Sequence, residues 1–299
     1  MLSIRAITTS LAFAGLGGVL AVPTASALAS TPTASPTTLV AIRAAHHTGY
    51  DRLVFQFSGR LPAHRSVRYV SRVVADPSGK VVPVSGSARL VVRFFAANGH
   101  KANGTSSYGP ARRTFALPGI IQVVNAGDFE AVLRFGVGVA KREPFKVFTL
   151  ANPSRFVIDI STPFRTSSVR DYFLDSRRFA EGKRPYIHAV NRPVIPPAVA
   201  FGALQRLYAG PTRAELSHGL RFVSSKSTGF SKVTINDHVA RVYLTGACSS
   251  GGSTFTVANE IMPTLKQFSS VRWVKIYNAA GQTERPTGHS DSIPECLEP

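Results

Sequence analysis

Residues 127–160 read GDFEAVLRFGVGVAKREPFKVFTLANPSRFVIDI, and this stretch decides the fold class of the first half of the chain. It holds three short runs, FEAVLRFGVGV, PFKVFTL and RFVIDI, in which apolar residues recur at alternate positions. That period is typical of β-strands with one face buried and the other in solvent. Asn152-Pro153-Ser154 separates the last two runs and supplies the residue types of a turn. The stretch therefore predicts short strands joined by turns.

The same pattern extends towards the N-terminus as far as Leu39. Three further runs alternate in this way, namely RLVFQFSG (52–59), SVRYVSRVVAD (66–76) and ARLVVRFF (88–95). In the first of them Leu53, Phe55 and Phe57 share one strand face. Turn signals of the types Asp-Pro-Ser-Gly and Asn-Gly separate the runs, and no long amphipathic helix interrupts them. Many short strands with such punctuation are typical of sandwiches and barrels, and we predict a β-sandwich over residues 39–165.

The second half, residues 168–299, begins with two predicted strands, VRDYFLD and PYIHAVNRPV. The stretch after Pro197 then predicts a helix with Phe201, Leu204 and Leu207 or Tyr208 on one face. Gly210-Pro211 supplies the residue types that end a helix.

A hairpin is predicted next, about Asn236-Asp237, and the chain closes with the strand VRWVKIYN. Between them a second helix should start at a Ser253 or Thr254 cap and carry Val257, Ile261, Leu265 and Phe268. Pro263 lies inside this helix, where it should kink the helix or cost roughly 3 kcal/mol. The order ββαββαβ predicts a small α+β domain.

The N-terminal residues predict export. Arg5 precedes an apolar run, Ile7 to Val22, and Ala-x-Ala cleavage patterns follow Pro23, so residues 1–29 are interpreted as a secretory signal peptide. The run is shorter than the roughly 20 residues that span a bilayer, and no transmembrane segment is expected in the mature chain. Residues 30–38 read STPTASPTT, and this composition predicts an extended Ser/Thr/Pro tether.

The chain has two cysteines, Cys248 and Cys296. In an exported protein two cysteines favour one disulfide over two free thiols. Zinc binding is the weaker alternative, because a zinc site needs about four ligands and neither cysteine belongs to a C-x-x-C pair. We predict the Cys248–Cys296 disulfide, which would tie down the C-terminal tail and allow Leu297 to pack.

The composition is strongly basic, with a formal net charge of +19. Such a charge predicts polyanionic partners. Nucleic acid is the usual partner of a basic protein, but export argues against it and favours the anions of the cell envelope. These are peptidoglycan carboxylates, teichoic-type phosphate polymers and lipid head groups. The alternative is a solvated basic surface with no dedicated partner.

Several stretches resemble known families of exported proteins. HHTGYDRLVFQFSGR (46–60) and the stretch quoted first resemble the opening and the close of the AMIN-like β domain, over about residues 38–163. Four later stretches resemble the GerMN domain of spore germination proteins, over about residues 168–299. They are ALQRLYAGPTRAELSHGL (203–220), INDHVARVYLTGAC (235–248), IMPTLKQFSSVRWVKIYN (261–278) and SDSIPECL (290–297). The string GPT-x-x-E-x-x-x-GL is the most specific of these matches. The GerMN resemblance implies non-catalytic envelope proteins tied to wall assembly or sporulation. The AMIN resemblance implies a β-sandwich that binds peptidoglycan.

The residues give no catalytic or metal site. The G-x-S-x-G motif that presents a nucleophilic serine is absent, and the eight histidines are scattered. Only His46-His47 is adjacent, and neighbouring strand residues face opposite ways. Asp128 and Glu130 share a predicted strand face, as the two carboxylates of a glycosidase do, although a solvated turn pair is the simpler interpretation. We therefore predict no enzyme activity, no metal and no cofactor.

Five residues are candidates for ligand binding: Arg52, Arg68, Tyr69, Arg72 and Arg155. Arg52 follows Asp51, and Arg155 precedes Asp159, so each arginine either forms a structural ion pair or holds a ligand's carboxylate or phosphate in a bidentate manner. Arg68 and Arg72 share a predicted strand face opposite Tyr69. Such a strand could bind a polyanionic glycan, and the same pattern is equally typical of an ordinary exposed strand.

The prediction is thus a secreted, cell-wall-associated, non-catalytic protein with an AMIN-like sandwich and a GerMN-like α+β domain. It would bind peptidoglycan, a teichoic-type anionic polymer or wall-assembly proteins. The alternative is an extracellular docking module for an envelope sensor kinase. The ligand, the oligomeric state and the process served stay open.

Overall fold

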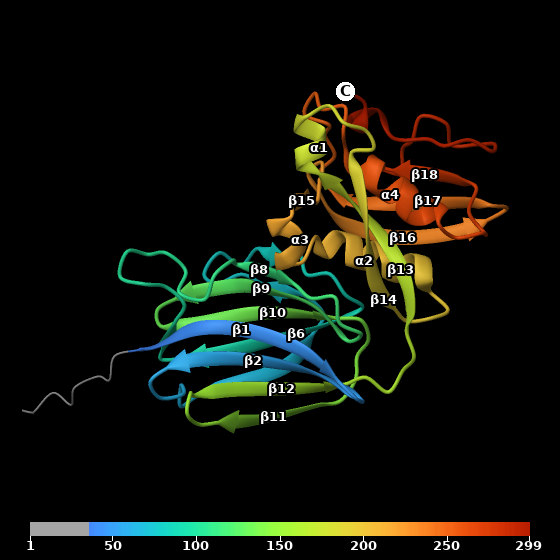
Figure 1. The fold of residues 1–299 in the computed structure, drawn as a ribbon. Helices are drawn as coiled ribbons and strands as arrows, with labels where there is room; N and C mark the ends of the chain where they lie inside the picture. The colour runs from blue at the N-terminus through green and yellow to red at the C-terminus, as the bar shows by residue number, and fades with distance from the viewer. Residues whose placement is uncertain (1–35) are drawn as a thin grey trace, which may run out of the picture. The chain divides into compact units, whose positions relative to one another are not determined.

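A computed structural model describes residues 36–299, so the predicted signal peptide and most of the tether lie outside the described residues. The described chain consists of a β-sandwich followed by an α+β domain (Figure 1), and both belong to one unit, residues 35–299. Within the described range no helix has both the length and the apolar character needed to cross a bilayer.

The sandwich is built from two five-stranded sheets. One sheet contains, in spatial order, β11 (Phe145–Leu150), β12 (Arg155–Ser161), β2 (Tyr50–Ser58), β1 (Thr37–His47) and β7 (Ala97–Asn98). The other contains β3 (Arg65–Val70), β6 (Ala88–Phe95), β10 (Val132–Val139), β9 (Ile120–Phe129) and β8 (Arg112–Thr114). The predicted strands of the opening stretch are therefore β10, β11 and β12, and they are divided between the two sheets.

The core lies between the two sheets. Leu53, Phe55 and Phe57, predicted to share a face of β2, are each at most 1% exposed. The ring of Phe55 lies 5.1 Å from that of Phe94 on β6 and 5.3 Å from that of Phe135 on β10, measured between centroids. Inward-facing aromatic side chains of both sheets thus meet in one apolar layer, which confirms the predicted alternation.

A covering segment, residues 73–86, lies over the outer face of the second sheet. It contains the short strands β4 (Val73–Val74) and β5 (Val81–Val82). Two glycines of the FGVGV run make room for it: a Cβ atom at Gly136 would lie 2.9 Å from Val73 Cγ1, and one at Gly138 would collide with the carbonyl oxygen of Ser85. The glycines of the opening stretch therefore determine what can pack on the sandwich.

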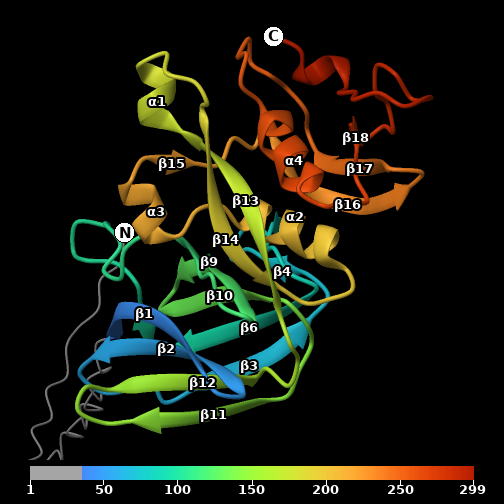
Figure 2. The same cartoon turned by 45° about the vertical axis from the view of Figure 1, so that its right-hand side comes forward.

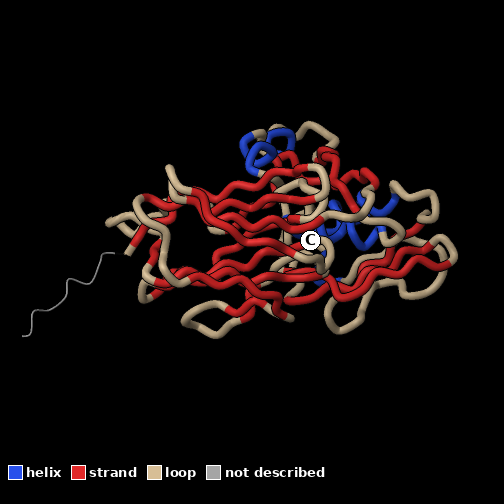
Figure 3. Tube along the Cα trace, turned by 90° about the horizontal axis from the view of Figure 1, so that it is seen from below, coloured by secondary structure: helices blue, strands red, loops and turns tan. Residues whose placement is uncertain are grey.

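The α+β domain follows the predicted order ββαββαβ, with two short helices and one short strand added. Its elements are β13 (Ser167–Asp175), α1 (Ser176–Ala180), β14 (Ile187–Val194), α2 (Val199–Ala209), α3 (Arg213–Ser217), β15 (Leu220–Arg221), β16 (Ser227–Asn236), β17 (Val239–Gly246), α4 (Val257–Lys266), β18 (Trp273–Tyr277) and a final 3₁₀ turn, Glu295–Leu297. The strands form two three-stranded sheets, β14-β13-β15 and β16-β17-β18 (Figure 2). Within residues 36–299 all the helices, blue in Figure 3, follow residue 175.

Three local predictions need correction. The turn between β16 and β17 is Asp237-His238, both with positive φ, one residue later than expected. The N-cap of α4 is Thr256, which forms a capping box with Asn259, and not Ser253 or Thr254. The helix ends at Lys266, so Phe268 follows the helix instead of belonging to it, whereas Pro263 lies inside it as expected.

The C-terminal tail is held by a disulfide between Cys248 and Cys296, whose Cα atoms lie 5.6 Å apart. The amide of Ser250 also donates to the carbonyl oxygen of Cys296 over 2.7 Å. Leu297 is 1% exposed and belongs to the apolar core beneath α2 and α4. The tail is thus part of the domain core.

Candidate functional site

Helix α2 of the α+β domain contacts the sandwich. Gln205 Nε2 donates to Ser87 Oγ over 3.1 Å, and Arg206 Nη2 donates to the carbonyl oxygen of Pro118 over 2.9 Å. The hydroxyl of Thr114 donates to the carbonyl oxygen of Ala209 at the helix end. Leu204 and Leu207, on its other side, are fully buried in the core of the α+β domain, so α2 is buried on both sides.

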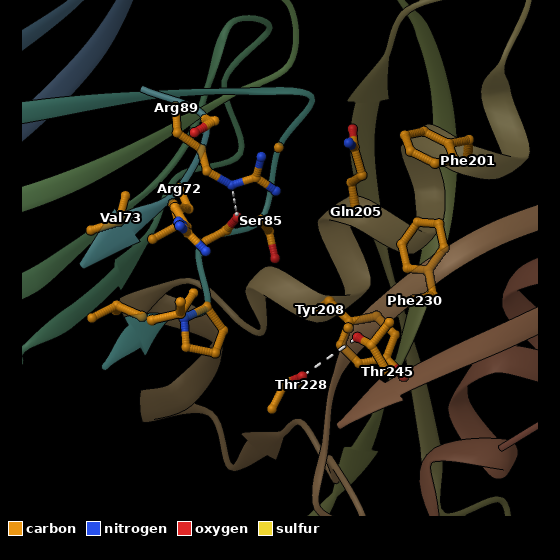
Figure 4. A pocket seen from close by; sticks show the side chains of 17 residues that line it. Arg72, Val73, Ser85, Arg89, Phe201, Gln205, Tyr208, Thr228, Phe230 and Thr245 are labelled. Carbon is orange, nitrogen blue, oxygen red and sulfur yellow. Dashed lines mark hydrogen bonds between the residues drawn. The ribbon is translucent and has the colours of Figure 1, made fainter. Parts of the chain in front are cut away.

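A pocket of about 360 Å³ lies beside this contact (Figure 4). One wall is formed by the sandwich and its covering segment, with Arg72, Ser85 and Arg89. The opposite wall is formed by α2 and the β16–β17 hairpin, with Gln205, Phe230 and further aromatic and hydroxyl side chains. We call this cavity the junction pocket.

The sandwich wall carries positive charge. Arg72 is exposed, and Arg89 is half-buried, with its Nε donating to the carbonyl oxygen of Val84 over 3.0 Å. Burial lowers the pKa of Arg89 below its usual range, yet an arginine so held stays protonated at neutral pH. Within the described part of the chain, no Asp or Glu lines the junction pocket. An anion entering it would meet two guanidinium groups and no competing carboxylate.

The opposite wall is aromatic. Phe201 and Phe230 pack edge to face with ring centroids 5.0 Å apart, and Tyr208 lies 5.9 Å from Phe230. Tyr208 shares a hydrogen bond of 3.0 Å with Ser227, and burial raises the pKa of the Tyr208 hydroxyl, which is therefore neutral. This wall offers apolar surface and neutral hydroxyls. The lining of the pocket is chemically complementary to an anionic, hydroxylated ligand.

Of the predicted binding residues, only Arg72 lines the junction pocket. Arg68 is exposed on β3, whereas Arg72 lies beyond the end of that strand, so the two do not form one strand face. Tyr69 is half-buried: its hydroxyl donates to the carbonyl oxygen of Glu143 over 2.6 Å, and Arg142 lies over its ring. The predicted combination of Arg68, Tyr69 and Arg72 is therefore not assembled.

Arg52 and Arg155 are engaged elsewhere and do not pair with their sequence neighbours. Arg52 forms two hydrogen bonds of 2.7 Å with Asp159 across β2 and β12. Asp51 is fully buried and accepts from the amides of Gly119 and Ile120 over 2.6 and 2.8 Å. Arg155 donates only to carbonyl oxygens of its own turn, among the contacts of the described residues.

The histidines and carboxylates weighed for catalysis have local contacts. His46 Nδ1 lies 2.7 Å from Asp51 Oδ1, and His47 stacks on a tyrosine. Asp128 contacts His100 Nδ1 over 2.8 Å, while Glu130 lies in the turn after β9 at positive φ. Across residues 36–299, no group of three or more His, Cys, Asp or Glu side chains is arranged to hold a metal.

Two family models match the chain. One, described as the AMIN-like domain, matches residues 37–162, and the other, described as sporulation and spore germination, matches residues 171–284. The chain therefore carries an AMIN-like domain followed by a GerMN domain.

Among solved structures, the chain is similar to the tandem GerMN domains of the sporulation protein GerM from Bacillus subtilis, at 19% identity and a TM-score of 0.29. The match covers 47% of this chain and 50% of that one, so it spans half the length of its relative. No curated protein matches the chain.

Arg89, Phe201, Tyr208 and Phe230 were not predicted as site residues. Phe201 and Tyr208 recur at helical spacing with other apolar residues, and this spacing predicts core positions for both of them. Arg89 begins a strand of alternating residues and has no local signal of binding. The pocket exists because α2 packs against particular strands of the sandwich. The spacing of apolar residues predicts strands and helices but does not predict which of them pack together.

Proposed function

We propose that the protein is an exported, non-catalytic component of the cell envelope that binds anionic wall material. The AMIN-like and GerMN domains fit an envelope-associated module without catalysis. The sequence of residues 1–29 supports export, and the Cys248–Cys296 disulfide fits an oxidising compartment. The ligand would be peptidoglycan or an associated teichoic-type polymer.

The junction pocket is the observation that carries this proposal. Arg72 and Arg89 present two positive charges to a cavity that has no carboxylate in its described lining. The wider chain, with a net charge of +19, attracts polyanions over a longer range. The aromatic wall supplies apolar contact for the uncharged part of a wall polymer.

Sedimentation with isolated sacculi tests the proposal. The mature protein should sediment with the wall at low salt and be released as salt shortens the Debye length from about 10 Å at 0.1 M to about 3 Å at 1 M. The double variant Arg72→Gln/Arg89→Gln should be released at lower salt than the parent. Arg60→Gln removes one exposed charge from the loop after β2, outside the pocket, and is the control.

Two results would contradict the proposal. If the parent protein stays in the supernatant at low salt, with and without teichoic polymer on the sacculi, it does not bind wall polymer. If treating the sacculi with protease abolishes binding, the partner is an envelope protein, as expected for a docking module. Incubation with peptidoglycan should release no muropeptides.

A further inference from the structure

The junction pocket is the first of three adjoining hollows. A second hollow of about 440 Å³ shares Pro83, Ser85, Tyr208 and Thr228 with it. A third of about 330 Å³ shares Arg112, Thr114, Pro211 and Leu216 with the second. Each hollow shares four lining residues with the next, so the three lie in a row along the junction, and we call this row of hollows the junction groove.

Arginines line the whole junction groove. Arg72 and Arg89 lie in the first hollow and Arg112 and Arg221 in the second, while the third adds Arg43, Arg113 and Arg213. No aspartate or glutamate lines any of the three hollows in the described structure. Of the ion pairs formed within residues 36–299, none involves an arginine of the groove.

Neutral groups position several of these guanidinium groups. Arg113 Nη1 donates to the carbonyl oxygen of Ile42 over 2.6 Å. Arg221 Nη1 donates to the carbonyl oxygen of the preceding residue, Leu220, over 2.8 Å. Carbonyl oxygens orient a guanidinium without cancelling its charge. Burial and, secondly, the charge of Arg213 lower the pKa of Arg113, so two cations repel each other in the third hollow. An anion between them would relieve that repulsion.

Glu215, the acidic residue of α3, is neutralised by an arginine outside the groove. Glu215 accepts two hydrogen bonds from the buried Arg192, the first of 2.8 Å, and one of 2.7 Å from the Thr212 amide. The Thr212–Glu215 capping box fixes the start of α3 and thereby the position of Arg213. The most specific string of the second half, GPT-x-x-E, thus places a cation in the groove while its carboxylate is held away from it.

We infer that the junction groove binds a single extended chain of a phosphodiester-linked polyol. The inference rests on the proposed function and adds the site and the class of polymer. Each phosphodiester keeps one negative charge and offers two oxygens to a guanidinium fork. Three hollows in a row, each with arginines that form no ion pair among residues 36–299, suit charges that recur along a thin unbranched chain. Phe201, Tyr208 and Phe222 provide apolar surface for the carbons between the charges.

The test uses fluorescently labelled poly(glycerol phosphate) oligomers of increasing length, with binding followed by anisotropy. Affinity should rise with length until the groove is filled, and glycerol phosphate alone should bind at least about 100-fold more weakly than the longest oligomer. Arg72→Gln and Arg213→Gln, at opposite ends of the groove, should each weaken binding of the longest oligomer about fivefold. Both side chains are exposed and form no hydrogen bond within the described structure, so both variants should fold.

Arg60→Gln is the matched control and should change affinity less than about twofold. If it weakens binding as much as the groove variants do, or if affinity does not depend on length, the groove is not the site. If polyglutamate or a single-stranded nucleic acid competes as well as the oligomer, charge alone is recognised and the polyol assignment is wrong.

The two proposals can fail separately. Binding to sacculi that is unchanged in Arg72→Gln and Arg213→Gln would overturn the groove and leave the wall-binding function intact. If the oligomer binds and the groove variants weaken that binding, but the protein does not bind sacculi, the wall-binding function is wrong and the groove remains a binding site for the polymer.

Discussion

Arg206 on α2 donates a hydrogen bond of 2.9 Å to the carbonyl oxygen of Pro118, so a buried cation joins the GerMN domain to the sandwich. Its other terminal nitrogen, Nη1, has no hydrogen-bond partner within the described residues. Burial lowers the pKa of Arg206 to about 10, against the attraction of Asp171, and the guanidinium is still charged at neutral pH. This contact also positions α2, which forms one wall of the junction pocket.

Arg206→Met should lower the free energy of unfolding by about 1–3 kcal/mol, because the carbonyl oxygen of the partly buried Pro118 loses its donor. Urea unfolding of the parent and the variant measures the effect. Arg60→Met, at an exposed position, should shift the midpoint little. Equal midpoints for Arg206→Met and the parent would show that the hydrogen bond does not stabilise the junction.

Asp171→Asn should remove a pH dependence of stability. Burial raises the pKa of Asp171 well above its usual value, more than Arg192 and Arg206 lower it, and neither carboxyl oxygen has a hydrogen-bond partner among the described residues. The folded state therefore keeps this proton to a higher pH than the unfolded chain does. The stabilisation is complete below the unfolded pKa of about 3.9 and is lost as the pH rises through the raised folded pKa.

The asparagine variant has no such proton, so its stability should rise relative to that of the parent as the pH is raised from about 4 through the raised folded pKa of Asp171. Unfolding in urea across this range measures the difference. Glu298→Gln, at an exposed tail position, is the control and should follow the parent. Parallel pH profiles for Asp171→Asn and the parent would show that Asp171 titrates alike in both states.

Reducing the Cys248–Cys296 disulfide should cost about 4 kcal/mol, from the loop entropy of a separation of 48 residues. Leu297 should then lose its protection from solvent. The double variant Cys248→Ser/Cys296→Ser should be equally destabilised and should not respond to reductant. Two titratable thiols in the denatured, unreduced protein would contradict the bond.

Gly138→Ala should destabilise the protein by about 1–3 kcal/mol, because the new methyl group would collide with the carbonyl oxygen of Ser85. The covering segment must move, so affinity for the oligomer should fall as well. Ser66→Ala, an exposed position of the same sheet, is the control. A variant with full stability and affinity would show that the segment yields without cost.

Arg52→Gln separates the two interpretations of the Arg52–Asp159 pair. The pair is bidentate and partly exposed, so the variant should lose only about 1 kcal/mol of stability. Affinity for the oligomer should be unchanged, because Arg52 does not line the groove. A loss of affinity as large as that of Arg72→Gln would instead make Arg52 a ligand-binding residue.

The alternation of apolar residues was enough to predict most strands, because a half-buried strand must alternate. Leu53, Phe55 and Phe57 are buried on one face as that pattern required. The α+β order was predictable for the same reason, since the apolar residues of α4 recur at helical spacing. Cap and turn positions were wrong by one to three residues: Thr256 and Asp237 compete with neighbours of similar chemistry, and tertiary packing selects between them.

The junction groove was not predictable from such periods. Its arginines come from strands, a loop and a helix far apart in the chain, and in the sequence each looks like an ordinary exposed arginine of its own segment. Phe201 has the spacing of a core residue but lies in the junction pocket, because α2 is covered by the sandwich along only part of its length. Only the docking of α2 on the sandwich brings these residues together.

The glycine at position 138 offers a way to sort related chains. A homologue with a larger residue there would keep the strands of its sandwich, since side chains on the outer face do not enter the core. It would need a different path for residues 83–86, and so a differently shaped first hollow. Gly138 and the arginines of the first hollow, Arg72 and Arg89, should therefore be gained and lost together during divergence, and chains that lack this glycine should not be assumed to share the same ligand.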